Sequence, residues 1–537
     1  MSNFTHSYIV NNITLPINAS HKEAFAIAFN KLKQLGVSTD DCEASVFRRS
    51  VDARRRGDIK LVYSIMISGN MPTLSAERMK KAGISSYSYS DPVFTIGEEP
   101  ITSNVVVVGS GPCGLFAALL LAEAGFKPLL LERGGSVKER QRCIDAFKNT
   151  RILDVNTNIQ FGAGGAGTFS DGKLITRIND RMSTYVLRRF VEFGAPEEIL
   201  YMAKPHVGTD ILAVVVDRIL DKIVSLGGQV LYHTEVRDFK TVGSRIVSLI
   251  TNNGEIDCSL ALLAIGHSAR DTYKRLIEKG CNIVAKPFSV GMRIEHLTDT
   301  IDRGMYGDMA GHPALGHAEY SLSYNTHERG VYTFCMCPGG VVVPAASEEG
   351  GVVVNGMSYH ARNGKNSNSA VCCNVFKEDY GGNPLDAIEY QRRIERAAFA
   401  AGGSDYSAPI ITVGDFLSGK CSREPTDVIP TYMDGVGVKI SDPSKYLPGK
   451  ITELIKRGIL DFDRKISGFA TSSAVLTGAE TRTSAPLRIV RDSDTRLATG
   501  YDNFYPAGEG AGYAGGITSA AIDGIHTAVA IINRYKP

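Results

Sequence analysis

Hydrophobic and polar positions in the first 90 residues follow two different periods. Some stretches place apolar side chains at every second position, as a strand with one buried face does, and others at every third or fourth position, as a helix does. The strand pattern covers 8–17, 43–52 and 59–68, and the helix pattern covers 21–36 and 74–82. With 93–96 as a last strand, this β-α-β-β-α-β order predicts a ferredoxin-like α+β module over residues 1–95.

The next pattern is a continuous apolar run. Val105–Val108 predicts a strand that is buried on both faces, and Leu115–Ala124 predicts a helix with small residues where it lies against a sheet. A second apolar strand is predicted at Pro128–Leu131. Strand, turn, helix and strand in this order are the beginning of a doubly wound parallel sheet.

Residues 205–265 continue the same kind of pattern. They contain a helix that ends at the glycine pair 227–228. Three further strands are predicted at 229–239, 245–251 and 260–265. These elements extend the parallel sheet toward residue 275.

The character of the chain changes at about residue 280. Up to 465 it shows short strands, turns and one long helix near 385–401, and the strand-turn-helix pattern returns after that. We therefore predict an α/β fold. A Rossmann-like domain is assembled from 100–275 and 466–537, and a mostly β domain is inserted at 280–465.

Composition agrees with several folded domains. The chain has 537 residues, more than one hydrophobic core supports, and 43% of them are hydrophobic and 22% charged. A formal net charge of +2 gives no overall field toward nucleic acid or an anionic membrane. The N-terminal residues lack the pattern of a secretory signal, so we expect a cytoplasmic protein without a membrane partner. The ten cysteines show no C-x-x-C spacing, and we expect no metal site.

Positive charge is concentrated in the N-terminal module. Residues 1–90 hold 12 basic and 7 acidic side chains, with Arg54, Arg55 and Arg56 in a row. An acidic partner or RNA could bind there. A solvated surface is favoured, because aromatic side chains do not interleave the basic run.

Three glycine triplets match G-x-G-x-x-G. Because about one residue in ten is glycine, one such match is expected by chance with a probability near one half, so the spacing alone decides little. The triplets are Gly109/Gly111/Gly114, Gly162/Gly164/Gly167 and Gly510/Gly512/Gly515. Only the first follows a buried strand and opens a predicted helix.

The first triplet carries the chemistry of a dinucleotide site. Its glycines permit a tight turn, close approach of the backbone to a diphosphate at the helix N-terminus, and close packing of helix on strand. Glu132 ends the second strand, 23 residues after Gly109, where an acid can accept hydrogen bonds from an adenosine ribose. An acid at this place disfavours a 2′-phosphate, so the pattern indicates FAD or NAD rather than NADP.

The C-terminal segment favours FAD over NAD. A predicted strand at 503–509 closes on Glu509, and the glycine-rich run Gly510–Gly516 leads into a helix at 517–533. A helix N-terminus beside the pyrimidine edge of an isoalloxazine stabilises negative charge on the reduced ring. NAD needs no such second site.

Three further segments complete a family resemblance. They are 158–174 (NIQFGAGGAGTFSDGKL), 287–296 (PFSVGMRIEH) and 335–340 (CMCPGG). Over nearly its whole length the chain resembles the uncharacterised bacterial FAD-dependent dehydrogenase family, within the flavoproteins that have two dinucleotide-binding folds. The resemblance implies that FAD is held by Gly109, Ser110, Gly111, Pro112, Cys113, Gly114, Glu132, Arg133, Gly165, Ala166, Gly167, Thr168, Ser170, Val236, Gly266, Gly508, Glu509, Gly515, Gly516 and Ile517.

The substrate is not readable from these motifs. The triplet at Gly162 is not followed by an amphipathic helix, so a second nucleotide domain is not predicted. Hydride then comes from the substrate itself or from NAD(P)H that binds transiently. We expect an FAD-dependent oxidoreductase that acts on a small molecule held by the inserted domain. The alternative is an FAD-containing protein that binds or modifies RNA through its basic module.

Catalytic residues stay open. Cys335 and Cys337 could form a redox pair beside the flavin, but packing is favoured because residues two apart on a strand point to opposite faces. His267 and Arg270 follow a strand and could face the ring edge, although a loop histidine is more often solvated. The polar stretch 358–369 suits a carboxylate or phosphate, or is a flexible surface loop.

Overall fold

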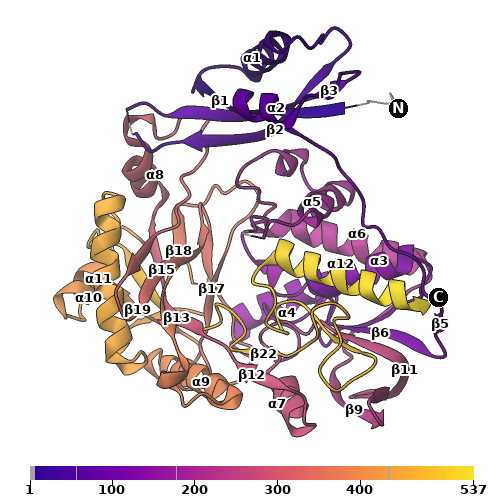
Figure 1. Cartoon of the computed structure of the whole chain (residues 1–537). Helices are drawn as coiled ribbons and strands as arrows, with labels where there is room; N and C mark the ends of the chain where they lie inside the picture. The colour runs from indigo at the N-terminus through magenta and orange to yellow at the C-terminus, as the bar shows by residue number, and fades with distance from the viewer. Residues whose placement is uncertain (1–5, 56, 177, 433–435) are drawn as a thin grey trace.

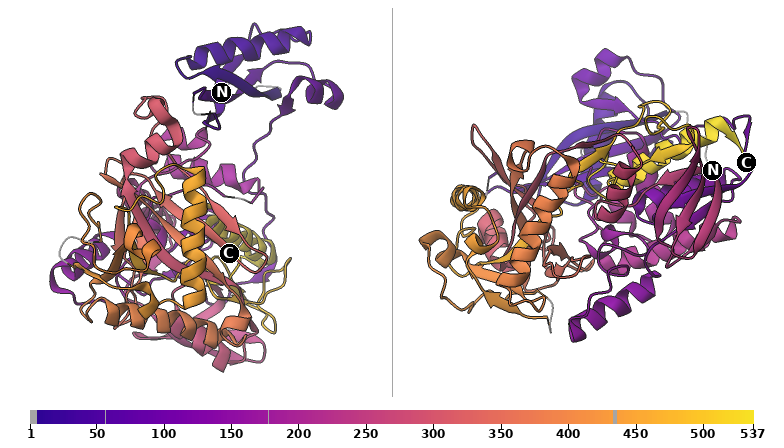
Figure 2. Two further views of the ribbon diagram at one scale, coloured as in Figure 1. Left: turned by 90° about the vertical axis from the view of Figure 1, so that its left-hand side faces the viewer. Right: turned by 90° about the horizontal axis from the view of Figure 1, so that it is seen from below.

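A computed structural model describes residues 6–55, 57–176, 178–432 and 436–537. In Figure 1 the N-terminal module lies above two larger bodies, each built on its own sheet. The two further views in Figure 2 show this module joined to the rest through an extended segment of chain. No helix within the described ranges is long and apolar enough to cross a membrane.

The N-terminal module is a four-stranded antiparallel sheet in the order β2-β3-β1-β4. Its elements are β1 (His6–Pro16), α1 (His21–Gln34), β2 (Glu43–Asp52), β3 (Lys60–Gly69), α2 (Ala76–Ala82) and β4 (Ile84–Ser86). Alternate residues of β3 are buried, and α1 buries Ala24, Ala28 and Leu32 at helical spacing, so the two periods of the sequence form one core.

One predicted strand of this module is wrong. The last strand is β4, which pairs with β1 at Val10, and residues 93–96 form an extended connection in which Val93 is 82% exposed. In the basic run, Arg54 forms an exposed ion pair with Asp52, and Arg56 lies outside the described residues. The RNA-binding alternative stays a prediction.

The second body is a Rossmann-like α/β domain around a seven-stranded sheet. Its parallel strands are β6 (Asn104–Val108), β7 (Leu129–Leu131), β8 (Gln229–Leu231), β11 (Gly254–Leu263) and β23 (Phe504–Pro506). The antiparallel strands β9 (Val236–Val242) and β10 (Arg245–Thr251) extend it beside β11. The predicted strand at 229–239 is therefore two strands, β8 and β9.

Helices cover one face of this sheet. They include α3 (Pro112–Glu123), α5 (Met182–Glu192), α6 (Thr209–Ser225) and α12 (Ile517–Arg534). The valine run is buried on both sides as predicted, because Val105 and Val107 join the core under these helices and Val106 and Val108 join the core on the opposite face. Figure 1 shows α12 beside α3, although 393 residues separate their ends. A Cβ at Gly524 of α12 would lie 2.2 Å from the Cys113 carbonyl oxygen, so glycine permits this close contact.

Short connecting elements complete this domain. They are α4 (Val137–Thr150), α7 (Arg270–Glu278), β5 (Glu99–Pro100) and β24 (Tyr535–Lys536). The strand β24 pairs in parallel with β5, so the end of the chain is fastened to the segment that enters the domain.

The third body is a second seven-stranded sheet in the order β14-β15-β18-β13-β21-β19-β20. Its strands are β13 (Phe288–Leu297), β14 (Ser323–Asn325), β15 (Gly330–Cys337), β18 (Asn366–Val375), β19 (Ala408–Thr412), β20 (Val438–Ile440) and β21 (Val475–Glu480). Small two-stranded sheets are formed by β12 (Ile283–Ala285) with β22 (Leu487–Ile489) and by β16 (Val341–Pro344) with β17 (Val354–Met357). Helices α8 (Thr298–Tyr306), α9 (Pro384–Ala401), α10 (Val413–Ser418) and α11 (Gly449–Lys465) surround it.

Two sequence predictions for this body need correction. The strand β21 lies between β13 and β19 in the second sheet, although we assigned residues from 466 onward to the Rossmann-like domain. The long helix near 385–401 is confirmed as α9, but α11 is nearly as long. Its buried residues Ile451, Ile455, Ile459 and Phe462 fall at helical spacing, so the signal for α11 was present in the sequence.

Candidate functional site

A cavity of about 330 Å³ lies at the carboxyl ends of the parallel strands. Its walls come from the first glycine turn, from the C-terminal segment and from the inserted domain. The predicted cofactor residues that line it are Gly109, Ser110, Gly111, Pro112, Cys113, Glu132, Arg133, Gly165, Ala166, Gly167, Ser170, Val236, Gly266, Glu509, Gly515, Gly516 and Ile517. Segments 400 residues apart thus meet around one space.

Three predicted residues do not line the cavity. A Cβ at Gly114 would lie 1.8 Å from the Gly109 carbonyl oxygen, and a Cβ at Gly508 would lie 2.8 Å from the Cys113 Cβ. Thr168 is buried, and its carbonyl oxygen accepts a hydrogen bond from Thr209 Oγ1 at 2.5 Å. These three residues pack behind the cavity wall and help to determine its shape.

The turn at Gly109 is built from backbone contacts. Gly109 has a φ of +98°, and a Cβ there would lie 2.4 Å from the Ala264 carbonyl oxygen, so only glycine fits. Helix α3 begins after Gly111 without a side-chain cap. A Cβ at Gly111 would meet only the Gly165 Cα, at 3.8 Å, so open space lies in front of the first N–H groups of α3.

Glu132 has a role that the sequence did not reveal. Its carboxylate accepts hydrogen bonds from Ser110 N at 3.0 Å, Ser110 Oγ at 2.6 Å, Gly134 N at 3.0 Å and Gly162 N at 3.0 Å. Four donors match the acceptor positions of one carboxylate. Glu132 therefore holds the glycine turn and the loop at Gly162 together, and its contact with a ribose stays a prediction.

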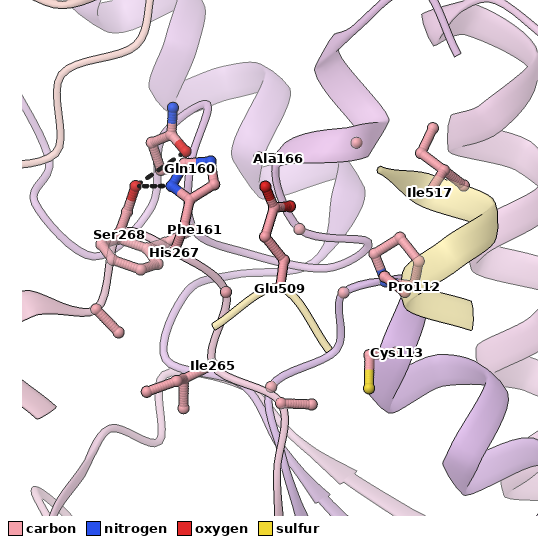
Figure 3. Close-up of a pocket in the computed structure, with 18 of the residues that line it drawn as sticks. Pro112, Cys113, Gln160, Phe161, Ala166, Ile265, His267, Ser268, Glu509 and Ile517 are labelled. Atoms are coloured by element: carbon pink, nitrogen blue, oxygen red, sulfur yellow. Dashed lines mark hydrogen bonds between the residues drawn. The ribbon is translucent and has the colours of Figure 1, made fainter. Parts of the chain in front are cut away.

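The C-terminal wall of the cavity is open, whereas the turn at Gly109 is closely packed. Helix α12 begins after Gly516 without a side-chain cap, and a Cβ at Gly515 or Gly516 would meet nothing within 4 Å. Figure 3 shows Glu509 pointing into the cavity, between Phe161 and His267 on one side and Pro112 and Ile517 on the other. Burial raises the pKa of the Glu509 carboxyl to about 7, and Lys286 only partly counteracts this.

His267 and Arg270 differ in position, because only His267 faces the cavity. His267 lines the cavity, and its Nδ1 lies 2.9 Å from Ser268 Oγ. Burial, followed by the positive charges of Arg482 and Arg270, lowers the pKa of His267 to about 3, so the ring is neutral. Arg270 is 3% exposed and does not line the cavity, so the ring-edge interpretation is wrong for this residue.

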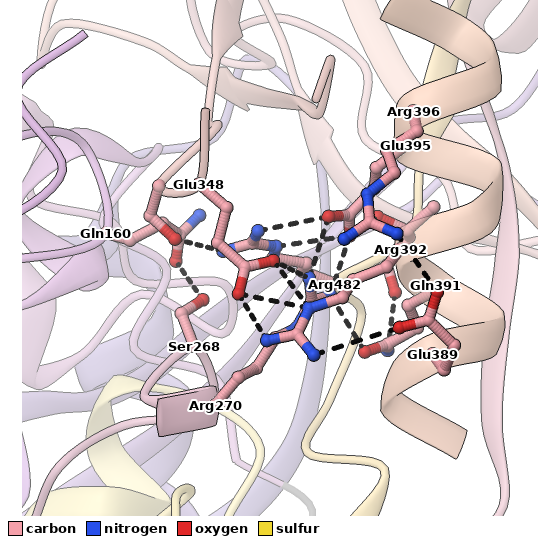
Figure 4. A network of polar contacts seen from close by, with 12 residues as sticks. Gln160, Ser268, Arg270, Glu348, Glu389, Gln391, Arg392, Glu395, Arg396 and Arg482 are labelled. Carbon is pink, nitrogen blue, oxygen red and sulfur yellow. Dashed lines mark hydrogen bonds and ion pairs between the residues drawn. The ribbon is translucent and has the colours of Figure 1, made fainter. Parts of the chain in front are cut away.

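Arg270 belongs to a buried network of charges that joins the two large domains (Figure 4). Its guanidinium donates to Glu395 at 2.7 and 2.8 Å and to Glu348 at 2.7 Å. Arg482, which lines the cavity, also donates to Glu395, at 3.2 and 3.3 Å. Because Arg270 begins α7 and Glu395 lies on α9, the network fixes the inserted domain against the cofactor side of the cavity.

The inserted domain supplies a wall of side chains. Phe334, Cys335, Asn355 and Glu480 line the cavity with Arg482. Asn355 and Glu480 could not be predicted from the sequence, because neither lies in a motif. They reach the cavity only through the pairing of distant strands.

The polar stretch 358–369 is not a flexible surface loop. Ser358 and Arg362 are buried and both donate to Asp171, and Arg362 also contacts Glu319. Asn368, on β18, is buried and accepts from Arg293 at 2.8 Å. Of these three residues and their partners, only Asp171 lines the cavity, so the stretch supports the site from outside. Within the described ranges, no cluster of three or more His, Cys, Asp or Glu side chains could hold a metal ion.

Three protein families match parts of this chain. The family described as "FAD-dependent protein, C-terminal domain-like" matches residues 287–483, and the family "FAD binding domain" matches 102–146. A domain of unknown function, DUF8436, matches residues 8–68. The matches fall on the inserted domain, the glycine turn and the N-terminal module.

Relatives were found at both full and partial length. An "Uncharacterized protein" from Clostridium beijerinckii is 42% identical over 532 residues, which are 98% of this chain and 98% of that protein. A digeranylgeranylglycerophospholipid reductase from Methanocaldococcus jannaschii is 32% identical over 90 residues, 16% of this chain and 23% of the reductase. Among solved structures, the flavin-dependent brominase Bmp2 has a TM-score of 0.37 at 12% identity and covers 80% of this chain and 79% of its own. CtdE in complex with FAD has a TM-score of 0.33 at 13% identity and covers 80% and 84%.

Proposed function

This chain belongs to an FAD-dependent protein family, shared with the Clostridium beijerinckii relative, and we propose that it transfers hydride between FAD and a small molecule held against the inserted domain. FAD is the cofactor, and the protein is a flavoprotein of the oxidoreductase class. The observation that carries the finer proposal is the single cavity in which the glycine turn, the C-terminal segment and the inserted domain meet.

The shape of the cavity suits FAD at both ends. In front of Gly111, Gly515 and Gly516 there is space that a side chain would fill, and two helices begin there without side-chain caps. The N–H groups that begin α3 would hold the diphosphate, since a helix N-terminus attracts negative charge. The N–H groups that begin α12 would lie at the flavin ring, which supplies the hydride chemistry when FAD is bound.

Arg133 would serve the adenosine end. Its guanidinium lies 4.5 Å from the centre of the Phe161 ring and forms an ion pair with Glu235 at 2.9 Å. This stack, with Val236 beside it in the cavity lining, gives a flat platform on which an adenine can lie.

Two groups of the chain differ in how they can handle protons. Glu509 has a pKa near neutrality, so its carboxyl can hold or release a proton under ordinary conditions. His267 stays neutral and offers a hydrogen-bonding ring to the cavity, while Arg482 adds positive charge on the inserted-domain side. This arrangement favours a polar or anionic small molecule beside the flavin.

The test begins with the visible spectrum of the purified protein. We expect the absorbance of bound FAD, and the Gly515→Val variant should lose it because the new side chain fills the cofactor space. The matched control is Gly449→Val, at the start of α11, where a Cβ also meets nothing within 4 Å but the residue does not line the cofactor cavity. Loss of FAD in both variants, or in neither, would contradict the proposed site.

The electron donor is tested by adding NADH or NADPH to the FAD-loaded protein without oxygen. Rapid bleaching by either would identify a nicotinamide that binds transiently. Slow bleaching would leave the small molecule as the hydride source, and a screen of polar and anionic compounds for bleaching then identifies its class. A folded protein without flavin absorbance would contradict the proposed function.

A further inference from the structure

We propose that Cys335 and Cys337 form a redox-active thiol pair that exchanges electrons with the FAD. The proposal rests on the proposed function, because it requires FAD in the cavity that Cys335 lines. It assigns a role to the segment CMC, which the cofactor contacts leave unused.

The backbone brings the two thiols to the same side of the strand. In β15, Phe334 pairs with Ala370 and Cys337 pairs with Asn368, so three steps along β15 match two along β18 and the strand bulges. Cys335 has a φ of +46°, which a non-glycine residue rarely adopts. The bulge cancels the usual alternation, and the Cys337 thiol donates a hydrogen bond to the Cys335 carbonyl oxygen at 3.3 Å.

The two thiols differ in access and in charge. Cys335 lines the cavity, whereas Cys337 is fully buried behind it. The interaction with the neighbouring Cys337 thiol, followed by the positive charges of Arg293 and Lys173, lowers the pKa of the Cys335 thiol to about 6. The same interaction and burial raise the pKa of the Cys337 thiol. A reactive thiolate that faces the cavity, backed by a protonated partner, is the division of labour found in dithiol redox pairs.

The cation that stabilises the thiolate is built into the sheet. Arg293 is fully buried on β13, and it donates to the Cys335 carbonyl oxygen at 3.0 Å and to Glu480 at 2.9 Å. The bond to the Cys335 carbonyl oxygen holds the bulge in place and keeps the positive charge of Arg293 near the Cys335 thiol. Strain held by such contacts is typical of functional sites.

The reaction balances with FAD as the oxidant. The Cys335 thiolate and the Cys337 thiol lose two electrons and the Cys337 proton, and a sulfur–sulfur bond forms. FAD takes up the two electrons and one proton. In the reverse direction, reduced FAD cleaves the disulfide, so electrons from the small-molecule substrate can be stored on the thiols.

The first test uses the unaltered FAD-loaded protein. After oxidation or reduction, the free thiols are alkylated, and the mass of the tryptic peptide 330–362 is measured by mass spectrometry. This peptide contains Cys335 and Cys337 and no other cysteine. We expect a disulfide within this peptide in the oxidised sample, and two blocked thiols after reduction. If both thiols stay blocked in every sample, the proposal is overturned.

The second test counts electrons during anaerobic reduction. The unaltered protein should take up twice as many electron equivalents per FAD as the Cys335→Ser and Cys337→Ser variants, because each variant retains only the flavin. The exposed Cys421→Ser variant is the control and should behave as the unaltered protein. Equal uptake by all four proteins overturns the proposal. A protein without flavin absorbance instead contradicts the proposed function, so the two failures are distinct.

Discussion

The cofactor wall and the inserted-domain wall of the cavity are built from different parts of the chain. The cofactor wall, from Gly109 to Cys113 and from Glu509 to Ile517, consists mainly of backbone and includes the open glycines 515 and 516. The inserted-domain wall presents side chains, with buried Arg293 and Glu480 directly behind or within it. A backbone wall recognises what many proteins share, a diphosphate and a ring, whereas a side-chain wall recognises what is specific to one reaction.

The largest effect is expected from Gly114→Ala, which disrupts the packing behind the cofactor wall. In Gly114→Ala the new Cβ would lie 1.8 Å from the Gly109 carbonyl oxygen, and no side chain can move to relieve this contact. We expect a large fall in the thermal unfolding midpoint and complete loss of bound FAD, measured by the ratio of flavin to protein absorbance.

The matched variant is Gly111→Ala in the same turn. Its Cβ would meet only the Gly165 Cα at 3.8 Å, so the protein without FAD should unfold at its usual temperature. The affinity for FAD should still fall by about tenfold or more, since the methyl group takes the space of the diphosphate. If both variants lose stability alike, close packing at Gly114 is not what distinguishes them.

The next effect breaks the side-chain wall. Arg293→Met removes the fully buried partner of Glu480 and leaves that carboxylate uncompensated. We expect a loss of about 3–5 kcal/mol, seen as a lower midpoint of thermal or denaturant unfolding.

The double variant Arg293→Met with Glu480→Leu sharpens this result. Replacing both charges removes the uncompensated group, so the double variant should be more stable than Arg293→Met alone. A double variant that is less stable than the single one would mean that the sheet requires the ion pair itself, and that the uncompensated charge of Glu480 does not explain the loss.

The smallest effect concerns the one carboxyl of the backbone wall. Its raised pKa means that, between about 4.5 and about 7, the unfolded chain releases the Glu509 proton before the folded chain does. The protein without FAD should therefore lose stability as the pH rises through this range.

Glu509→Gln removes this contribution. Its unfolding midpoint should exceed that of the unaltered protein by a few degrees above neutral pH, with little difference at acidic pH. Glu453→Gln, an exposed site on α11, is the control and should leave the pH profile unchanged. A profile that is identical in Glu509→Gln and the unaltered protein would argue against a raised pKa.

The two walls also differ in how far the sequence predicted them. Of the residues assigned to the cofactor, all but Gly114, Thr168 and Gly508 line the cavity, and a Cβ at Gly114 or Gly508 would collide with neighbouring atoms. These residues belong to short segments in which one element leads directly into the next. Spacing and glycine content identified the turn at Gly109 and the C-terminal glycines, and the family resemblance implied the other residues.

The inserted-domain wall could not be predicted from the sequence, because its contacts join strands that are distant along the chain. Asn355 and Glu480 line the cavity from separate strands. Arg270 does not line the cavity and instead donates a hydrogen bond to Glu395 on α9. The alternation that we assumed for Cys335 and Cys337 does not hold, because β15 bulges between Phe334 and Cys337.

The α/β class, the position of the glycine turn and the choice of FAD could therefore be predicted from the residues alone. Each of these follows from short-range periodicity and from residues that only one backbone geometry accepts. The bracing role of Glu132, the network around Arg270, the place of β21 and the bulge between Phe334 and Cys337 became visible only in the folded chain. The physical reason is that hydrogen bonds and ion pairs act over a few ångströms in space, whatever the separation of their partners along the chain.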